Sequence, residues 1–257
     1  MKKLVVSLNI GNYAPKIRKI CTPYARYWAK KIGADFKWIT KPKFNRTPNY
    51  EKFQIYEMSK KYDWTFFIDA DLLIPIDWID PTEFLEKDCV LFNDTDFANH
   101  RFRYDHCFRR SHSNYGATTW FCAFSDWTRD AWRPMELQDD MTWKKAIENI
   151  RPIQIEKNFG IDREHIVDDY LVSRNIAKYG LKVKTLKRDI YPALGLSPSL
   201  NHLFLDSIEN KQRFLKNVVD VWKKLDGGFY AEEHKGAVPT RNDFPLKEHL
   251  KKQNDKK

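Results

Sequence analysis

The chain has 257 residues, with 45 Lys and Arg against 35 Asp and Glu, a formal net charge of +10, and 42% hydrophobic residues. This composition is typical of a globular protein and excludes disordered, collagen-like and linker sequences. No apolar run reaches the ~18 to 20 residues that a transmembrane helix needs, because even the apolar segment 65–79 contains three acids and a proline. The first residues predict a β-strand rather than a signal peptide, so we expect a cytoplasmic protein.

The cysteines and the basic residues do not indicate a special class of protein. Four cysteines at wide spacing favour reduced, mostly buried thiols over a disulfide framework, and the spacing around Cys107 does not fit common zinc sites. The charge is spread along the chain without a nucleic-acid-binding signature, so no nucleic acid partner is expected. The basic tail at 246–257 is expected to be solvated, and a peripheral contact of this tail with a membrane surface stays open.

Apolar periodicity and turn residues predict a βαβαβ arrangement for the first seventy residues. The expected elements are a strand at Leu4–Ile10, a helix from Pro15 to Ile32 ended by Gly33, a strand at Phe36–Thr40, a helix at Tyr50–Lys61 and a strand at Trp64–Ile68. Short connections between alternating strands and helices are typical of a parallel, doubly wound sheet covered by helices.

The rest of the chain predicts less regular elements. We expect strands at Cys89–Phe92, Thr119–Phe124 and Lys182–Leu186, and helices at Trp127–Trp132, Met141–Ile150, His165–Tyr179 and Ser207–Leu225. The segment Asn93–Tyr115 predicts a long polar and aromatic loop, and loops of this length are usually functional. Since no repeat or linker is visible, we expect one α/β domain over residues 1–245.

The strand at Trp64–Ile68 runs directly into Asp69-Ala70-Asp71. In open α/β sheets ligands bind at the carboxyl ends of the strands. The alternation of an extended chain would point Asp69 and Asp71 the same way, with the small Ala70 between them. Such a carboxylate pair is typical of Mg²⁺ or Mn²⁺ sites that share the ion with water and phosphate oxygens. A second match, Asp94-Thr95-Asp96, is the weaker candidate for the metal.

Residues Leu4–Tyr13 and Tyr50–Asp71 together resemble the front half of the GT-A-fold glycosyltransferases, and most closely their glycogenin-like and bacterial galactosyltransferase-like branch. The resemblance covers about the first 95 residues, and the rest only in fragments. It implies a single GT-A (Rossmann-like) domain with a mostly parallel central sheet flanked by helices. In this fold residues from about 1 to 95 would bind the nucleotide sugar, those from about 96 to 205 would face the acceptor, and 206–228 would form a C-terminal helix.

The resemblance also implies an activity. A Mn²⁺ or Mg²⁺ ion on Asp69 and Asp71 would hold the diphosphate of a nucleotide sugar, with UDP favoured. The sugar, which we expect to be a hexose, would pass to a hydroxyl of a glycan, lipid or protein acceptor. Because relatives place a histidine after the last strand, His202 would complete the metal shell. The glycine, lysine, proline and tryptophan that follow that histidine in the glycogenin-like branch are absent here.

For the donor, the resemblance implies that Asn9, Gly11 and Tyr13 line the nucleotide pocket, with Tyr13 a candidate to stack on the base. Lys52 lies on the helix before the aspartates, where relatives carry a base that approaches the diphosphate. The alternatives for Tyr13 and Lys52 are a half-buried tyrosine and a solvated lysine.

For the acceptor, Asp168 and Asp169 resemble the acidic pair that opens a late helix in these enzymes. A carboxylate is stabilised at a helix N-terminus and could deprotonate the acceptor hydroxyl. We expect one of the two to cap the helix and the other to function, without distinguishing them. With such a base the reaction inverts the anomeric configuration, and without one retention stays open.

Two other functions compete with this interpretation. A nucleotidyltransferase or metal nuclease would also use two carboxylates, but it needs a phosphate-binding Gly-Ser turn or P-loop upstream, and none is visible. A non-catalytic glycan-binding relative would keep the fold and the aromatic residues without turnover.

Overall fold

The structure is a computed structural model that describes residues 1–93, 119–158, 160–194 and 207–225. One six-stranded sheet has the order β2-β1-β3-β5-β4-β6. Its strands are β1 (Lys3–Leu8), β2 (Ala34–Ile39), β3 (Trp64–Ile68), β4 (Cys89–Phe92), β5 (Phe121–Ser125) and β6 (Lys182–Thr185). Strand β5 runs antiparallel to β3 and β4, and the other pairings are parallel. The expected α/β class with a mostly parallel sheet is therefore confirmed.

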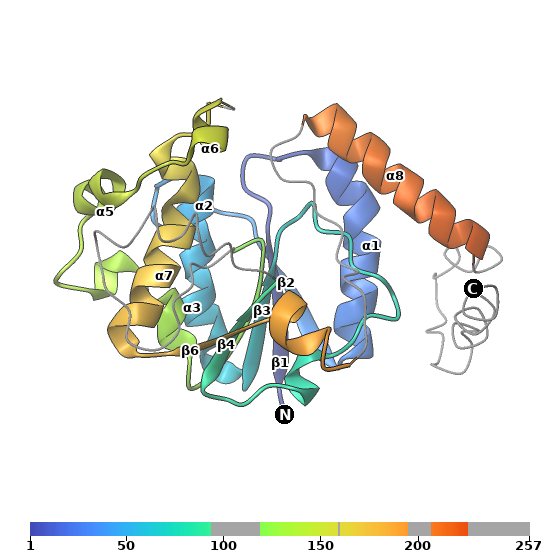
Figure 1. Cartoon of the computed structure of the whole chain (residues 1–257), viewed down its shortest axis with the longest axis horizontal. Helices are drawn as coiled ribbons and strands as arrows, with labels where there is room; N and C mark the ends of the chain where they lie inside the picture. The colour runs from blue at the N-terminus through green and yellow to red at the C-terminus, as the bar shows by residue number, and fades with distance from the viewer. Residues whose placement is uncertain (94–118, 159, 195–206, 226–257) are drawn as a thin grey trace.

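Helices cover both faces of the sheet, with α1 and α8 on one side and the other α-helices on the opposite side (Figure 1). The α-helices are α1 (Pro15–Lys31), α2 (Pro48–Glu51), α3 (Ile55–Met58), α5 (Trp143–Asn149), α6 (Gln154–Asn158), α7 (Val167–Tyr179) and α8 (Ile208–Leu225). Short 3₁₀ turns lie at Lys52–Gln54, Ser59–Lys61, Pro81–Glu83, Arg129–Trp132, Met135–Leu137 and Arg163–Ile166, and a π-helical turn lies at Leu186–Ile190. None of these described helices combines the length and apolarity that a membrane span requires.

The four central strands, β1, β3, β4 and β5, are mostly apolar because both of their faces are buried, whereas the edge strands β2 and β6 carry exposed charged residues. On the α7 side, Val6 and Phe67 belong to a core cluster that includes Trp132. On the α1 side, Val5 and Phe66 belong to a second cluster, where the ring of Trp28 meets Phe66 edge-on at 5.1 Å between centroids. Neighbouring residues of one strand thus serve opposite layers.

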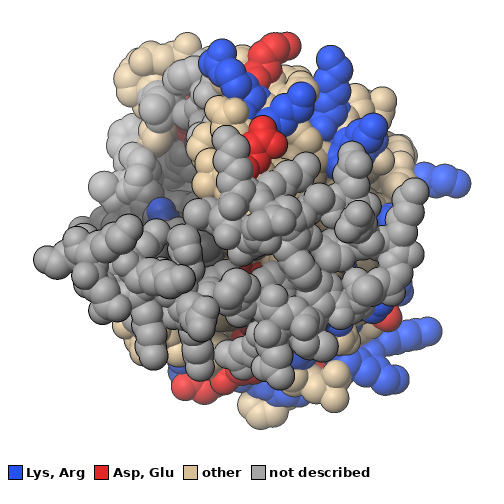
Figure 2. All heavy atoms as spheres, turned by 90° about the vertical axis from the view of Figure 1, so that its right-hand side faces the viewer, with Lys and Arg blue, Asp and Glu red and all other residues tan. Residues whose placement is uncertain are grey.

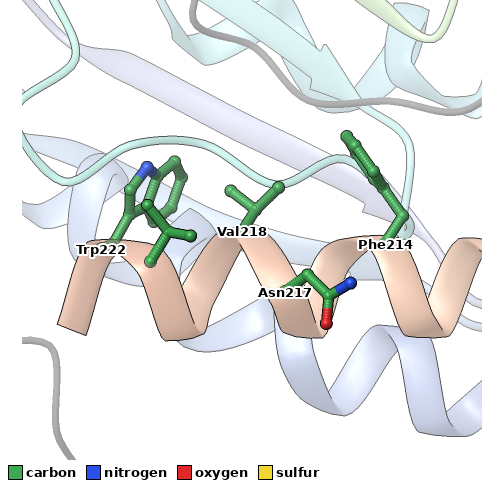
Figure 3. A pocket seen from close by; sticks show the side chains of 5 residues that line it. Phe214, Asn217, Val218 and Trp222 are labelled. Carbon is green, nitrogen blue, oxygen red and sulfur yellow. The ribbon is translucent and has the colours of Figure 1, made fainter. Parts of the chain in front are cut away.

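Helix α8 packs against α1 through a third apolar cluster. Leu215 and Val219 are buried in this cluster, and the ring of Trp222 meets Tyr24 edge-on at 5.8 Å. Figure 3 shows Phe214, Val218 and Trp222 along one side of α8. Together with Asn217 and Val221 they line a shallow hollow. The hollow belongs to the surface of this helix and contains no carboxylate.

The expected helix at Tyr50–Lys61 is interrupted in the structure, where α2 and α3 alternate with 3₁₀ turns. Four successive residues, from Tyr50 to Phe53, are buried. A regular helix with one apolar face cannot bury four successive side chains in this way. The buried Glu51 carboxylate also accepts backbone N–H groups of Lys43 (2.7 Å) and Phe44 (3.0 Å), which joins this segment to the preceding loop.

The strands at Trp64–Ile68 and Cys89–Phe92 have the expected ends, and most other expected elements are present with shifted ends. The helix expected at Trp127–Trp132 is a short 3₁₀ turn at Arg129–Trp132. The helix expected at His165–Tyr179 begins as a 3₁₀ turn, and α7 itself starts at Val167. Gly33 and Gly180 follow α1 and α7 with φ of 68° and 63°, the left-handed conformation that favours glycine. Cys21, Cys89 and Cys122 are buried free thiols, as expected, whereas Cys107 lies outside the described residues.

Figure 2 shows the charged side chains on one face of the molecule. On the described part of the surface in Figure 2, Lys and Arg side chains are interspersed with acidic ones.

Candidate functional site

Three segments meet at the carboxyl end of β3. Strands β1 and β3 are parallel, and Ser7 pairs with Ile68, so the loop after β1 starts beside Asp69. Strand β5 runs the opposite way, so the residues before it, Thr119 and Trp120, lie at the same edge of the sheet. The backbone N–H of Asp69 donates to the carbonyl oxygen of Trp120 at 2.9 Å.

The Asp69-Ala70-Asp71 segment is a turn rather than an extension of β3. The strand ends at Ile68, and the N–H of Leu72 donates to the carbonyl oxygen of Asp69 at 3.1 Å. The expectation that strand alternation orients the two aspartates was therefore wrong, because alternation requires an extended chain. Asp71 is buried (6% exposed), whereas Asp69 and Ala70 are partly exposed.

Asp71 forms an ion pair with Lys211 of α8, at 2.9 Å between the carboxylate and the ammonium nitrogen. Both side chains are almost buried, with about 8% and 10% exposure. Burial alone would lower the pKa of Lys211, but the charge of Asp71 outweighs it and raises that pKa. Lys211 also lies near the hydroxyl of Tyr13, whose own pKa is raised by burial and by Asp71.

Asp69 shares the ammonium group of Lys52 with Asp168. The nitrogen lies 2.8 Å from Asp168 and 3.2 Å from Asp69, and its side chain is 6% exposed. Burial would lower the pKa of Lys52, but the two carboxylates raise it instead, so the lysine stays charged. The ammonium also lies 5.1 Å from the centre of the Phe67 ring. The solvated helix lysine considered as the alternative for Lys52 is excluded by this burial.

Asp168 and Asp169 stand in the first turn of α7 and contact Thr119. The hydroxyl oxygen of Thr119 lies 2.6 Å from Asp168 and 2.8 Å from Asp169, and the Thr119 N–H donates to Asp169 at 2.9 Å. The N-cap position belongs to Ile166, so neither aspartate occupies the capping position expected for one of them. Asp168 is 2% exposed, whereas Asp169 is partly exposed. Asp169 is therefore the carboxylate that a substrate reaches more easily.

The loop after β1 is tightly folded. Gly11, Asn12 and Ala14 have positive φ values of 69°, 54° and 42°. The guanidinium of Arg18 donates to the side-chain oxygens of Asn9 and Asn12, the latter at 2.9 Å. This arrangement leaves Gly11 and Tyr13 exposed, and Tyr13 lies next to the pair of Asp71 and Lys211.

The donor set and the charge of the cluster fit a divalent cation. Asp69 and Asp71 offer hard carboxylate oxygens of the kind that Mg²⁺ and Mn²⁺ prefer. In the described cluster four carboxylates, Asp69, Asp71, Asp168 and Asp169, face the ammonium groups of Lys52 and Lys211. This leaves two negative charges uncompensated, which is the charge of one divalent cation.

A second acidic cluster lies at the opposite edge of the sheet, where β4 begins. Ligand atoms of Glu86, Asp88 and Cys89 lie within 4.8 Å of one another. Both carboxylates are paired with lysines of β6, Glu86 with Lys184 at 2.5 Å and Asp88 with Lys182. These surface ion pairs are sufficient to explain the cluster.

The structure brings together six of the residues expected at the site: Tyr13, Lys52, Asp69, Asp71, Asp168 and Asp169. Asn9 and Gly11 lie in the loop after β1, and Ala70 lies between the two aspartates. His202, Asp94, Asp96 and most of the expected loop Asn93–Tyr115 lie outside the described residues. Sequence reasoning missed Thr119 and Lys211. Thr119 carried no signal besides its place at the start of a predicted strand. For Lys211 the sequence contained a weak signal. Its positive charge lies near the N-terminus of a predicted helix, where the helix dipole disfavours a cation.

No protein-family model matches the sequence, and no curated protein matches it. Among the solved structures that are similar to this chain are two glycosyltransferases. One, a glycosyltransferase involved in the glycosylation of the major capsid of PBCV-1, has a TM-score of 0.48 at 11% identity and covers 84% of this chain and 100% of its own. The other, the galactosyltransferase LgtC with donor and acceptor sugar analogs, has a TM-score of 0.47 at 12% identity and covers 77% of this chain and 80% of its own. Both likenesses are distant.

Proposed function

We propose that this chain is a glycosyltransferase. It transfers a sugar from a nucleoside-diphosphate sugar to a hydroxyl of a glycan, lipid or protein acceptor. We expect the sugar to be a hexose. The donor base we favour is uridine, and the cation we favour is Mn²⁺, with Mg²⁺ the alternative. The observation that carries the proposal is the convergence of the loop after β1, the two aspartates after β3 and the acidic first turn of α7 at one edge of the sheet.

On the donor side, Asp69 and Asp71 would hold the cation through their carboxylates. When bound, the cation neutralises the diphosphate and the charge that develops on it as the bond to the sugar breaks. Tyr13, about half exposed, offers a ring face to the base, and stacking of this kind contributes about 1 to 3 kcal/mol per base. Asn9 lies in the same loop, where a hydrogen bond from the Arg18 guanidinium to its side-chain oxygen orients it.

On the acceptor side, Asp169 is the group that we assign to the hydroxyl. It is partly exposed, and the Thr119 N–H holds it at 2.9 Å. Asp168 is buried against Lys52 and acts as a positioning residue, because it fixes the ammonium that also contacts Asp69. As the acceptor oxygen bonds to the anomeric carbon, the bond from that carbon to the diphosphate breaks, and Asp169 takes the hydroxyl proton.

The proposal is tested by thermal unfolding with a panel of nucleoside diphosphates and nucleotide sugars, each with and without Mn²⁺. A ligand at a hundredfold excess over its dissociation constant stabilises the folded state by about 2.7 kcal/mol, a measurable shift in melting temperature. We expect one nucleotide to stabilise the protein, more strongly with Mn²⁺. Donor hydrolysis and transfer to simple glycan acceptors are then assayed with that nucleotide sugar.

The matched variants are Asp71→Asn and Asp77→Asn. Asp77 is an exposed aspartate six positions further along the chain, so its substitution removes the same charge away from the cluster. We expect the Mn²⁺-dependent shift to disappear in Asp71→Asn and to persist in Asp77→Asn. Absence of any shift in the native chain would reject the nucleotide-sugar site. Binding without transfer to any acceptor would favour the glycan-binding alternative.

A further inference from the structure

The ion pair between Lys211 and Asp71 links the C-terminal helix α8 to the aspartate turn after β3. The two residues are 140 positions apart in the sequence. Besides this pair, the described part of α8 is attached to the body of the protein through the apolar cluster that includes Leu215 and Val219. The first turn of α8 is therefore held to the site by charge, and the following turns are held by packing.

Lys211 lies where the helix itself disfavours a cation. Its backbone N–H donates to the carbonyl oxygen of Ser207 at 2.9 Å, which places it in the first turn of α8. Positive charge near a helix N-terminus is unfavourable, because the unpaired N–H groups there are themselves partly positive. The contact with Asp71 compensates for this cost and is therefore the reason that the ammonium is stable in this place.

The same contact occupies an oxygen that a cation would use. The ammonium nitrogen lies 2.9 Å from one carboxylate oxygen of Asp71, and both side chains are about nine-tenths buried. An ammonium ion and a divalent cation at such short distance from each other repel strongly where little water screens them. Both cannot be held by the same buried carboxylate at full strength.

We propose that Lys211 and a divalent cation compete for Asp71, so that binding of the cation releases the first turn of α8 from the site. This inference rests on the proposed function in one respect, which is that the cation binds at Asp69 and Asp71. Lys211 is the counter-ion of Asp71 in the absence of the cation. Once released, its ammonium stays at the edge of the site, where the anionic diphosphate of the donor would lie.

The first test is a titration of the full chain with Mn²⁺ alone, followed by the paramagnetic resonance signal of the free ion. We expect Lys211→Met to bind Mn²⁺ at least about tenfold more tightly than the native chain, because the competing charge is gone. Lys211→Arg keeps that charge and should bind as weakly as the native chain. Lys216→Met is the matched control, since Lys216 is an exposed lysine of the same helix, and it should not change the affinity.

The second test needs no substitution, which matters if Lys211→Met folds poorly. Backbone hydrogen exchange is measured on the native chain with and without Mn²⁺. We expect faster exchange in the first turn of α8 when Mn²⁺ is present, and unchanged exchange around Leu215. Slower or unchanged exchange in the first turn would overturn the inference.

The outcomes separate this inference from the proposed function. Equal Mn²⁺ affinity in Lys211→Met and the native chain, with loss of binding in Asp71→Asn, would reject the competition and leave the cation site intact. Mn²⁺ binding that survives in Asp71→Asn would place the cation elsewhere and overturn both. Tighter binding in Lys211→Met, combined with failure of every nucleotide to bind, would support the competition and reject the donor site.

Discussion

At the scale of single residues, Lys52 supplies the positive charge that Asp69 and Asp168 share. Its ammonium is buried, lies within 3.2 Å of two carboxylates, and has a raised pKa because those carboxylates outweigh its burial. A lysine with a raised pKa in the folded state contributes stability below its ordinary pKa, and this contribution is lost only as the pH rises above that range. The contribution of Lys52 is therefore constant at neutral pH.

Lys52→Met should destabilise the fold. The substitution leaves Asp168 buried without its cation, and breaking a buried ion pair in this way costs about 3 to 5 kcal/mol. The measurement is the free energy of unfolding by urea. The double variant Lys52→Met, Asp168→Asn should be more stable than Lys52→Met, because it removes the uncompensated charge as well.

The matched control is Lys60→Met. Lys60 also pairs with an acid, Glu57 at 2.8 Å, but its side chain is 53% exposed. Exposed pairs contribute little, so the change should stay within about 0.5 kcal/mol. A cost of the same size at both positions would contradict the role assigned to the buried ammonium.

At the scale of elements, helix α7 is followed by Gly180, whose backbone adopts the left-handed conformation. Gly180 has φ of 63°, and its N–H donates to the carbonyl oxygen of Ile176. A Cβ atom built on Gly180 meets nothing within 4 Å, so substitution causes no clash. The cost of a side chain there is conformational alone.

Gly180→Ala should therefore lower the free energy of unfolding by about 1 to 2 kcal/mol, since a left-handed conformation costs this much for an L-residue. Gly180→Asn should cost less, because asparagine tolerates this conformation better. Both are measured by chemical denaturation. Equal costs for Ala and Asn would indicate a steric cause rather than a conformational one.

Elements with strong local signals could be predicted from the sequence. The strands at Trp64–Ile68 and Cys89–Phe92 were predicted with correct ends, because each is a short apolar run between turn residues. The start of α1 at Pro15 and its end before Gly33 were also predicted, since proline and glycine act through their own backbone preferences.

Elements that depend on tertiary contacts could not be predicted. The interruption of the segment at Lys52 follows from its burial on the sheet, which no local pattern encodes. The same holds within the site, where Asp69 and Asp71 could be found from their place after a strand. Their lysine partners could not, because the pairing of Asp71 with Lys211 connects residues 140 positions apart.

At the scale of the whole molecule, the buried carboxylates of the site keep lysine partners in the absence of a cation. Asp71 is paired with Lys211, and Asp69 and Asp168 share Lys52. The fold should therefore stay intact when divalent cations are removed. We expect the melting temperature of the free protein to be the same with EDTA and with no addition, measured by circular dichroism. A large drop in EDTA would mean that a cation is part of the folded structure.

The way in which the core clusters share the central sheet predicts that the protein unfolds cooperatively. Neighbouring residues of one strand pack into opposite core clusters, so neither layer can lose its packing while the sheet stays intact. Helix α8 is joined to α1 by the third cluster. A protein connected in this way should unfold as one cooperative unit. We expect the midpoints of urea unfolding measured by helical circular dichroism and by tryptophan fluorescence to coincide. Each of the three apolar clusters contains a tryptophan, Trp132, Trp28 or Trp222, so fluorescence reports on all of them. Separate transitions would show that the chain comprises more than one domain.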